Sequence, residues 1–232
     1  MKNGIMPKNC HEITGLSRAQ NTFMPPAIVV AAVLLIGLFC DSPASWASFH
    51  DYLEIKAENA KIEENYRDWL ERSRKHQRII DTSSHSKISR WRTHLQAVHF
   101  GDERQGLQRL NTMVNEDIVY RDDYSHFHVR DYWSEPDIVL EEGGDCEDIA
   151  LLKAASLLRL NWPAERMQLL VGYLTERGRK ESHAVLLVET TSGEQLIMRS
   201  IANSVIAPHE FSFLPIYAVN GKGVFIVRPT YR

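Results

Sequence analysis

The chain has 232 residues, which is enough for one domain with a sizeable hydrophobic core. Hydrophobic residues make up 44% of the sequence and charged residues 25%, a composition that excludes an intrinsically disordered protein. The formal net charge of -3 gives no electrostatic basis for binding nucleic acid.

Residues 1–47 have the layout of a secretory signal peptide. A basic lead precedes the apolar run from Ala27 to Cys40, which is shorter than the roughly 20 residues that span a bilayer. The small residues Ser45 and Ala47 then predict cleavage after Ala47, with an uncleaved N-terminal anchor as the alternative. We therefore expect an exported protein.

Cleavage would change the cysteine content of the protein. Cys10 and Cys40 would leave with the signal peptide, and Cys146 would be the only cysteine of the mature chain. A single cysteine cannot form an internal disulfide, so its thiol is either buried and inert or a reactive group.

The first half of the mature chain reads as helical. Apolar residues at helical spacing predict a charged helix within Phe49 to Asp81, which we expect to pack on the main domain. Two amphipathic helices are expected within Ile88–His99 and Arg104–Asn115. Ile118 to Tyr120 is at most a short strand, and the polar, aromatic stretch after it reads as a loop.

The second half begins with a strongly patterned helix from Cys146 to Leu160, whose wide apolar face predicts a central position. Five short apolar runs follow: MQLLVGYL, HAVLLVET, QLIMRSI, FSFLPIYAVN and VFIVRP. Helices followed by strands predict an α+β fold, with an antiparallel sheet packed on the central helix. The expected units are the signal peptide 1–47, an N-terminal helical segment 48–85 and the main domain 86–232.

Cys146 is the first candidate for chemistry. Free backbone N–H groups in the first turn of a helix favour negative charge and lower the pKa of a thiol. Gly143 and Gly144 would leave the backbone open to a substrate. His183 opens a later strand, and a cysteine with a facing histidine is suited to nucleophilic acyl transfer, although a structural histidine gives the same spacing.

Three carboxylates surround this cysteine in the sequence. Asp145, Glu147 and Asp148 would each raise the pKa of the thiol by like-charge repulsion. They are either negative charge at a helix N-terminus or ligands of a hard cation, for which oxygen ligands suit calcium. A bound cation would cancel the repulsion, but three carboxylates are too few for a complete calcium site.

The segments DYWSEPDIVLEEGGDCEDIALLK and SHAVLLVE resemble the bacterial transglutaminase-like cysteine proteinases of the LapG type. The shared features are YW-x-x-P before GDCED at the head of a helix, and a histidine on a later strand. The upstream TMVNEDIVYRDD and the late FLPIYAVNGKGVF are also similar, so the resemblance covers roughly Trp91 to Val227.

This resemblance implies a papain-like, transglutaminase-type core and a periplasmic, calcium-dependent endopeptidase. Such an enzyme would cleave large surface adhesins and release cells from biofilm, and an inner-membrane receptor for cyclic di-GMP would sequester it. By motif position, Cys146 would be the nucleophile and His183 the general base. The implied calcium ligands are Asp145, Glu147 and Asp148.

The chain departs from the family at the third catalytic residue, an aspartate in a V-L-D-N motif. The corresponding strand reads LIMRSIANSV, and our alignment places Arg199 at the aspartate and Ser200 at the asparagine. Arginine repels imidazolium and cannot accept a hydrogen bond, so His183 should be a poorer base. On this alignment, Arg199→Asp should raise activity.

Several interpretations of this departure remain open. The chain could act as a Cys–His dyad at reduced rate, or Asn203 or Glu189 could replace the aspartate as acceptor. It could also be a binding module that grips an adhesin or receptor without cutting. Acyl transfer to amines, as in a transglutaminase, shares the same chemistry up to the thioester.

Overall fold

The computed structural model describes residues 52–54, 68–176 and 179–227. Its helices are α2 (Trp69–Thr82), α3 (Ser86–Leu95), α4 (Glu103–Asp117), α5 (Asp123–Phe127), α6 (Pro136–Glu142) and α7 (Cys146–Arg159). The predicted signal peptide lies outside the described residues. No helix in the described ranges is long and apolar enough to cross a membrane.

The strands form one antiparallel sheet in the order β1-β7-β6-β2-β3-β4-β5. They are β1 (Tyr52–Glu54), β2 (Met167–Glu176), β3 (Arg179–Glu189), β4 (Gln195–Met198), β5 (Val205–Ile206), β6 (Phe213–Asn220) and β7 (Gly223–Val227). The strand β3, which carries His183, pairs with β2 from Arg179 to Val188 and with β4 from Leu186 to Glu189. His183 is therefore held by backbone hydrogen bonds between β3 and β2.

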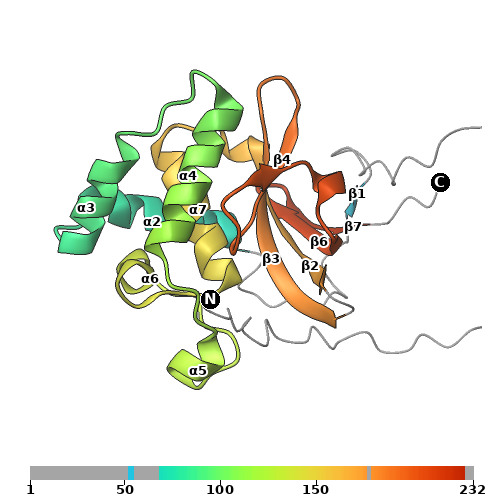
Figure 1. Ribbon diagram of the computed structural model, residues 1–232, viewed down its shortest axis with the longest axis horizontal. Coiled ribbons are helices and arrows are strands. Elements are labelled where there is room, and N and C mark those ends of the chain that lie inside the picture. The colour runs from blue at the N-terminus through green and yellow to red at the C-terminus, as the bar shows by residue number, and fades with distance from the viewer. Residues whose placement is uncertain (1–51, 55–67, 177–178, 228–232) are drawn as a thin grey trace, which may run out of the picture.

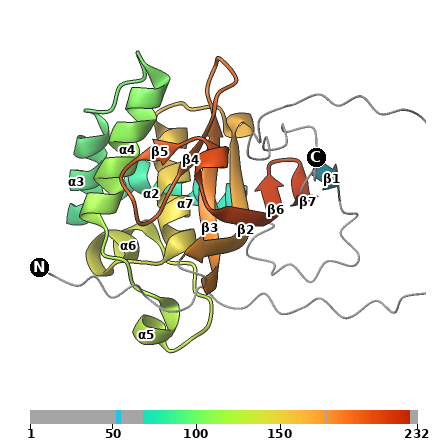
Figure 2. The ribbon, with the colours of Figure 1, turned by 45° about the vertical axis from the view of Figure 1, so that its right-hand side comes forward.

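The helices gather on one side of the sheet, and α7 lies between the sheet and the outer helices (Figures 1 and 2). It contacts β3 on one side and α2 and α4 on the other. These layers confirm the predicted α+β fold with a central helix packed on an antiparallel sheet.

The helix α7 is enclosed on all sides over most of its length. Every residue from Cys146 to Leu157 is buried, which explains why apolar residues occur around the whole helix and not on one stripe only. Four of these residues carry ionisable side chains that are costly to bury: Cys146, Glu147, Asp148 and Lys153. The candidate site is built around them.

The N-terminal helix α2 packs against α7. Trp69 and Ile80 are buried in the main hydrophobic core, and Asp81 at the end of α2 forms an ion pair with Arg159 at the end of α7. The strand β1 differs from expectation, because Tyr52–Glu54 lies in a stretch predicted to be helical. Its backbone pairs with β7, a long-range contact that local periodicity does not reveal.

Candidate active site

Cys146 is the first residue of α7, and a tight backbone junction places it there. Gly143 ends α6 with a φ of 98°, and a Cβ at this residue would lie 2.1 Å from the carbonyl oxygen of Val119. A Cβ at Gly144 would lie 2.6 Å from Oδ2 of Asp148. The two glycines therefore allow close internal packing, whereas the sequence suggested that they leave the backbone open to a substrate.

The sulfur of Cys146 lies inside the protein, and the residue is 1% exposed. Its Sγ is 3.0 Å from Oε2 of Glu147, a hydrogen-bonding distance for a thiol. An ionised carboxylate at this distance opposes formation of a thiolate. The reactivity of Cys146 therefore depends on what neutralises Glu147.

His183 lies on β3 and is 6% exposed. Burial, and secondly the charge of Lys153, lowers the pKa of His183 from 6.5 to about 4. The imidazole is therefore neutral at neutral pH and can accept a proton. Its Nε2 is buried and has no hydrogen-bond partner within the described ranges.

Ser200 lies between the backbone of Cys146 and the strand that carries His183. Its Oγ lies 3.5 Å from the backbone carbonyl oxygen of Cys146 and 3.5 Å from that of Ala184, the residue after His183. Ser200 is buried, and it brings the end of β4 to the first turn of α7. The sequence alignment gave Ser200 no catalytic role.

Arg199, which our alignment places at the family's aspartate, directs its side chain toward Ser204 and Phe211. Its guanidinium contacts the hydroxyl of Ser204 and lies 5.8 Å from the centre of the Phe211 ring. Phe211 belongs to a second hydrophobic cluster, separate from the core that contains Cys146. Both Arg199 and Ser200 follow the end of β4 at Met198. Burial and the charge of Lys153, and not the charge of Arg199, shift the pKa of His183.

Neither of the other suggested acceptors is placed to replace an aspartate. Glu189 is six residues from His183 along β3, which corresponds to about 20 Å at the rise of a strand. The side chain of Asn203 donates a hydrogen bond of 3.3 Å to Glu116 on α4.

Five carboxylates form an acidic cluster around the start of α7. Asp145, Glu147 and Asp148 are all buried, as is Asp123 at the start of α5. Ligand atoms of Asp123, Asp145 and Asp148 lie within 4.8 Å of one another, as do those of Asp123, Asp131 and Glu147. The structure thus unites the three carboxylates predicted from the sequence and adds Asp123 and Asp131, which sequence reasoning missed.

Burial and mutual repulsion strongly perturb this acidic cluster. Burial and the neighbouring carboxylates raise the pKa of Asp145 and of Glu147 well above their usual values. Burial, as the largest cause, raises the pKa of Asp148 to about 7 and that of Asp123 to about 6. Without a compensating cation, Asp145 and Glu147 therefore resist ionisation at neutral pH.

The hydrogen bonds of the acidic cluster are incomplete. The backbone N–H of Ser134 donates to Oδ1 of Asp148 at 2.7 Å, and that of Tyr132 donates to Asp123. Oδ2 of Asp148 and Oδ1 of Asp145 are buried and have no hydrogen-bond partner among the described residues, and Asp145 makes no capping hydrogen bond to α7. Unpaired buried oxygens from several carboxylates fit a hard divalent cation such as calcium better than they fit helix capping.

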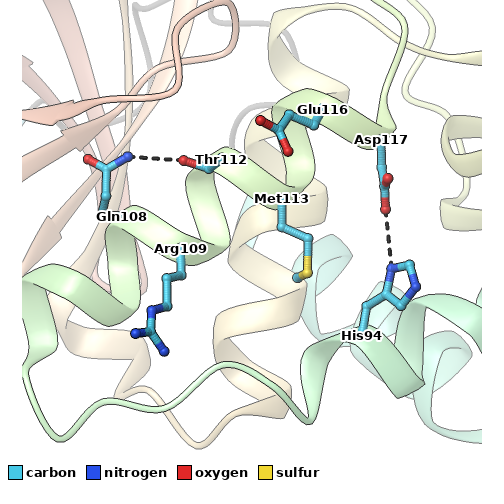
Figure 3. A pocket seen from close by; sticks show the side chains of 7 residues that line it. All are labelled: His94, Gln108, Arg109, Thr112, Met113, Glu116 and Asp117. Atoms are coloured by element: carbon cyan, nitrogen blue, oxygen red, sulfur yellow. Dashed lines mark hydrogen bonds and ion pairs between the residues drawn. The ribbon is translucent and has the colours of Figure 1, made fainter.

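A separate pocket of about 360 Å³ opens between α3 and α4. Figure 3 shows the ion pair of 3.4 Å between His94 and Asp117 in this pocket. The other residues that line it are Gln108, Arg109, Thr112, Met113 and Glu116. None of the candidate catalytic or metal-binding residues lines this pocket, so we do not assign it to the active site.

Solved structures share this fold. An EGTA-treated form of Legionella pneumophila LapG superposes with a TM-score of 0.53 at 21% sequence identity, over 69% of this chain and 88% of that one. A calcium-bound form of the same protein gives a TM-score of 0.52 at 22% identity, over 68% and 87% of the two chains. No curated protein matches the sequence.

The family comparison is more specific than these structural matches. Residues 76–214 match the model of the bacterial transglutaminase-like cysteine proteinases, and this match contains both the GDCED motif and His183. Because it covers more than half of the chain, the protein belongs to the family of bacterial transglutaminase-like cysteine proteinases.

Proposed function

We propose that this protein is an exported, calcium-dependent cysteine endopeptidase that cleaves a large surface adhesin and so acts in biofilm release. One observation carries the proposal: the Cys146 sulfur at the head of α7 lies within the same buried cluster as Asp145 and Glu147. Family membership supports a peptidase, and the calcium-bound form of Legionella LapG supports the choice of cation.

The proposed reaction is hydrolysis of a peptide bond. Neutral His183 accepts the proton of the Cys146 thiol, and the sulfur attacks the carbonyl carbon of the substrate. His183 returns the proton to the leaving amine as the peptide bond breaks and a thioester forms. Water, deprotonated by His183, then hydrolyses the thioester and restores the thiol.

The acidic cluster fits calcium, with Asp123, Asp131, Asp145, Glu147 and Asp148 as the residues that would hold it. A bound calcium ion supplies positive charge that offsets the repulsion among the carboxylates. Glu147 is the link to the reaction, because its Oε2 lies 3.0 Å from the Cys146 sulfur. When Glu147 binds a cation, it no longer opposes the thiolate.

Cleavage of a purified adhesin fragment in calcium tests the proposal. Cys146→Ala should abolish cleavage while leaving the melting temperature close to that of the wild type. Gly101→Ala is the control, because a Cβ at this residue meets nothing within 4 Å, and it should leave cleavage intact. Cleavage that persists in Cys146→Ala would exclude Cys146 as the nucleophile.

A binding module is the second candidate function. It is favoured by the unpartnered Nε2 of His183 and by the absence of an aspartate at residues 199 and 200. Such a module would hold an adhesin or an inner-membrane cyclic di-GMP receptor with equal affinity in the wild type and in Cys146→Ala. The wild type would then cleave neither partner.

The proposed location is the periplasm, on the strength of the signal-like residues 1–47. Cell fractionation tests this directly. The protein should be found in the periplasmic fraction with an N-terminus close to residue 48, and recovery of the uncleaved chain from the membrane fraction would instead indicate an anchor.

A further inference from the structure

Side chains of α4 hold the segment between β4 and β5. The Nδ2 of Asn115 donates hydrogen bonds of 2.8 Å to the carbonyl oxygens of both Arg199 and Ala202. One turn earlier, the Nδ2 of Asn111 donates to the carbonyl oxygens of Ala202 and Asn203 at 2.9 and 2.7 Å. The segment after β4 is therefore fixed by amide side chains on one face of α4.

Lys153 joins this network from inside the protein. It lies on α7 and is fully buried, and its Nζ donates to Oδ1 of Asn115 and to the carbonyl oxygen of Arg199, both at 2.7 Å. No Asp or Glu in the described part of the chain forms an ion pair with it. Burial, as the main cause, holds the pKa of Lys153 well below its usual value.

Stability alone does not explain a lysine at residue 153. A buried lysine without a carboxylate partner in the described part of the chain is costly, and an apolar side chain of similar length would fill the same volume at lower cost. Methionine, which is unbranched, would fit the same helical position. A function that needs the two hydrogen bonds of Nζ accounts for the lysine better.

The contacts of Lys153 lead to the candidate active site in two steps. Lys153 fixes the carbonyl group of Arg199, and the next residue, Ser200, lies 3.5 Å from the carbonyl oxygens of Cys146 and Ala184. The backbone of Ser200 is thereby held at the junction between the first turn of α7 and β3. A shift of this backbone would move the Ser200 hydroxyl away from both candidate catalytic residues.

We propose that Lys153 is a positioning residue of the active site. It acts through the Arg199 carbonyl group and Ser200 to fix the position of Cys146 relative to His183. Asn115 assists it, because the Asn115 amide binds both Nζ of Lys153 and the Arg199 carbonyl oxygen. This inference rests on the proposed roles of Cys146 and His183.

The test is the alkylation rate of Cys146 by iodoacetamide in the reduced full-length protein with calcium, measured by peptide mass spectrometry. Lys153→Met should slow alkylation about tenfold, because small misplacements of reacting groups are costly. Gln108→Ala is the matched control: it removes an α4 amide that binds the far end of the same segment, at Asn203 and Val205. This variant should alkylate at the wild-type rate even if its melting temperature falls.

A double-mutant cycle tests whether Lys153 acts through Ser200. Ser200→Ala should slow alkylation, and Lys153→Met combined with Ser200→Ala should be no slower than the slower single variant. Independent effects, which multiply in the double variant, would overturn the proposal. So would an unchanged rate in Lys153→Met, or an equal loss in Gln108→Ala.

If Lys153→Met does not fold, Asn115→Leu gives a second test, because it removes the contacts of Asn115 with both Lys153 and Arg199. An unchanged alkylation rate in this variant would also overturn the proposal. The readout needs no substrate, so it is separate from the proposed peptidase activity. An enzyme that cleaves adhesin but is unaffected by Lys153→Met would refute only this inference.

Discussion

Arg199 and Ser200 are neighbours in the sequence, but their side chains have different surroundings. The hydroxyl of Ser200 lies beside the first turn of α7, whereas the guanidinium of Arg199 contacts Ser204. The guanidinium of Arg199 lies over the ring of Phe211, outside the core that contains Cys146. A one-residue change in alignment therefore changes which side chain is assigned to the active site.

This geometry reverses the effect expected from the sequence for a substitution at residue 199. Arg199→Asp should leave the alkylation rate of Cys146 unchanged, because its new carboxylate would face Ser204 and Phe211. Ser200→Ala, which removes the hydroxyl beside Cys146, is the comparison that should be slower. A clear gain of rate in Arg199→Asp would show that residue 199 reaches His183 after all.

Only those residues of the site that lie close to Cys146 in the sequence could be predicted from the sequence. Cys146 and its adjacent carboxylates share one helical turn, so the motif alone indicated them. Asp123 lies more than 20 residues upstream and Lys153 contacts a carbonyl group at residue 199, so both join the site only through folding. Chain spacing carries no signal for such contacts.

At the scale of elements, the junction between α6 and α7 controls where Cys146 and the acidic cluster lie. Gly143→Ala should lower the free energy of unfolding by about 1–3 kcal/mol, because alanine is strained at a φ of 98° and its Cβ would meet Val119. Urea unfolding measures the loss. Gly101→Ala is the matched control, since a Cβ there meets nothing within 4 Å, and an equal loss in both variants would contradict this account.

The docking of α2 should depend on pH through His76. Burial lowers the pKa of His76 from 6.5 to about 4, and the neighbouring Glu135 partly opposes this shift. The folded protein therefore binds fewer protons here than the unfolded chain does between these pH values. The associated stability is fully present above about pH 6.5 and is lost as the pH falls through 4.

His76→Gln should remove this pH dependence. The free energy of unfolding of the wild type relative to the variant should fall by at most about 3 kcal/mol between pH 7 and pH 4. Urea unfolding at several pH values measures this difference, and the exposed His99→Gln serves as the control. A constant difference between the wild type and His76→Gln would show that His76 is not buried in its neutral form.

Most elements were predictable because burial dictates their composition. The apolar α7 and the Val- and Leu-rich β2 and β3 are continuous, strong patterns. The sequence prediction missed α5, which lies in the polar stretch predicted to be a loop, and α6, which is short and lies within the family motif. It also missed β5, which has only two residues. Tyr52–Glu54 was wrongly predicted as helical because its pairing with β7 lies far along the chain.

At the scale of the whole molecule, the acidic cluster joins parts of the chain that lie far apart in the sequence. Asp123 and Asp131 come from the stretch around α5, and the other carboxylates come from the head of α7. A cation bound here would tie this stretch to the central helix and at the same time remove negative charge from the surroundings of the Cys146 sulfur. Calcium should therefore affect stability and thiol reactivity together.

The most direct test of the central claim is the alkylation rate of Cys146 against pH, in calcium and in chelator. We predict that calcium accelerates alkylation and moves the midpoint of the curve below the free-thiol value of about 8.5. Asp148→Asn should lose this response, since it removes one carboxylate from the cluster. Identical curves in calcium and chelator, with a midpoint at or above that value, would contradict a calcium-supported nucleophile.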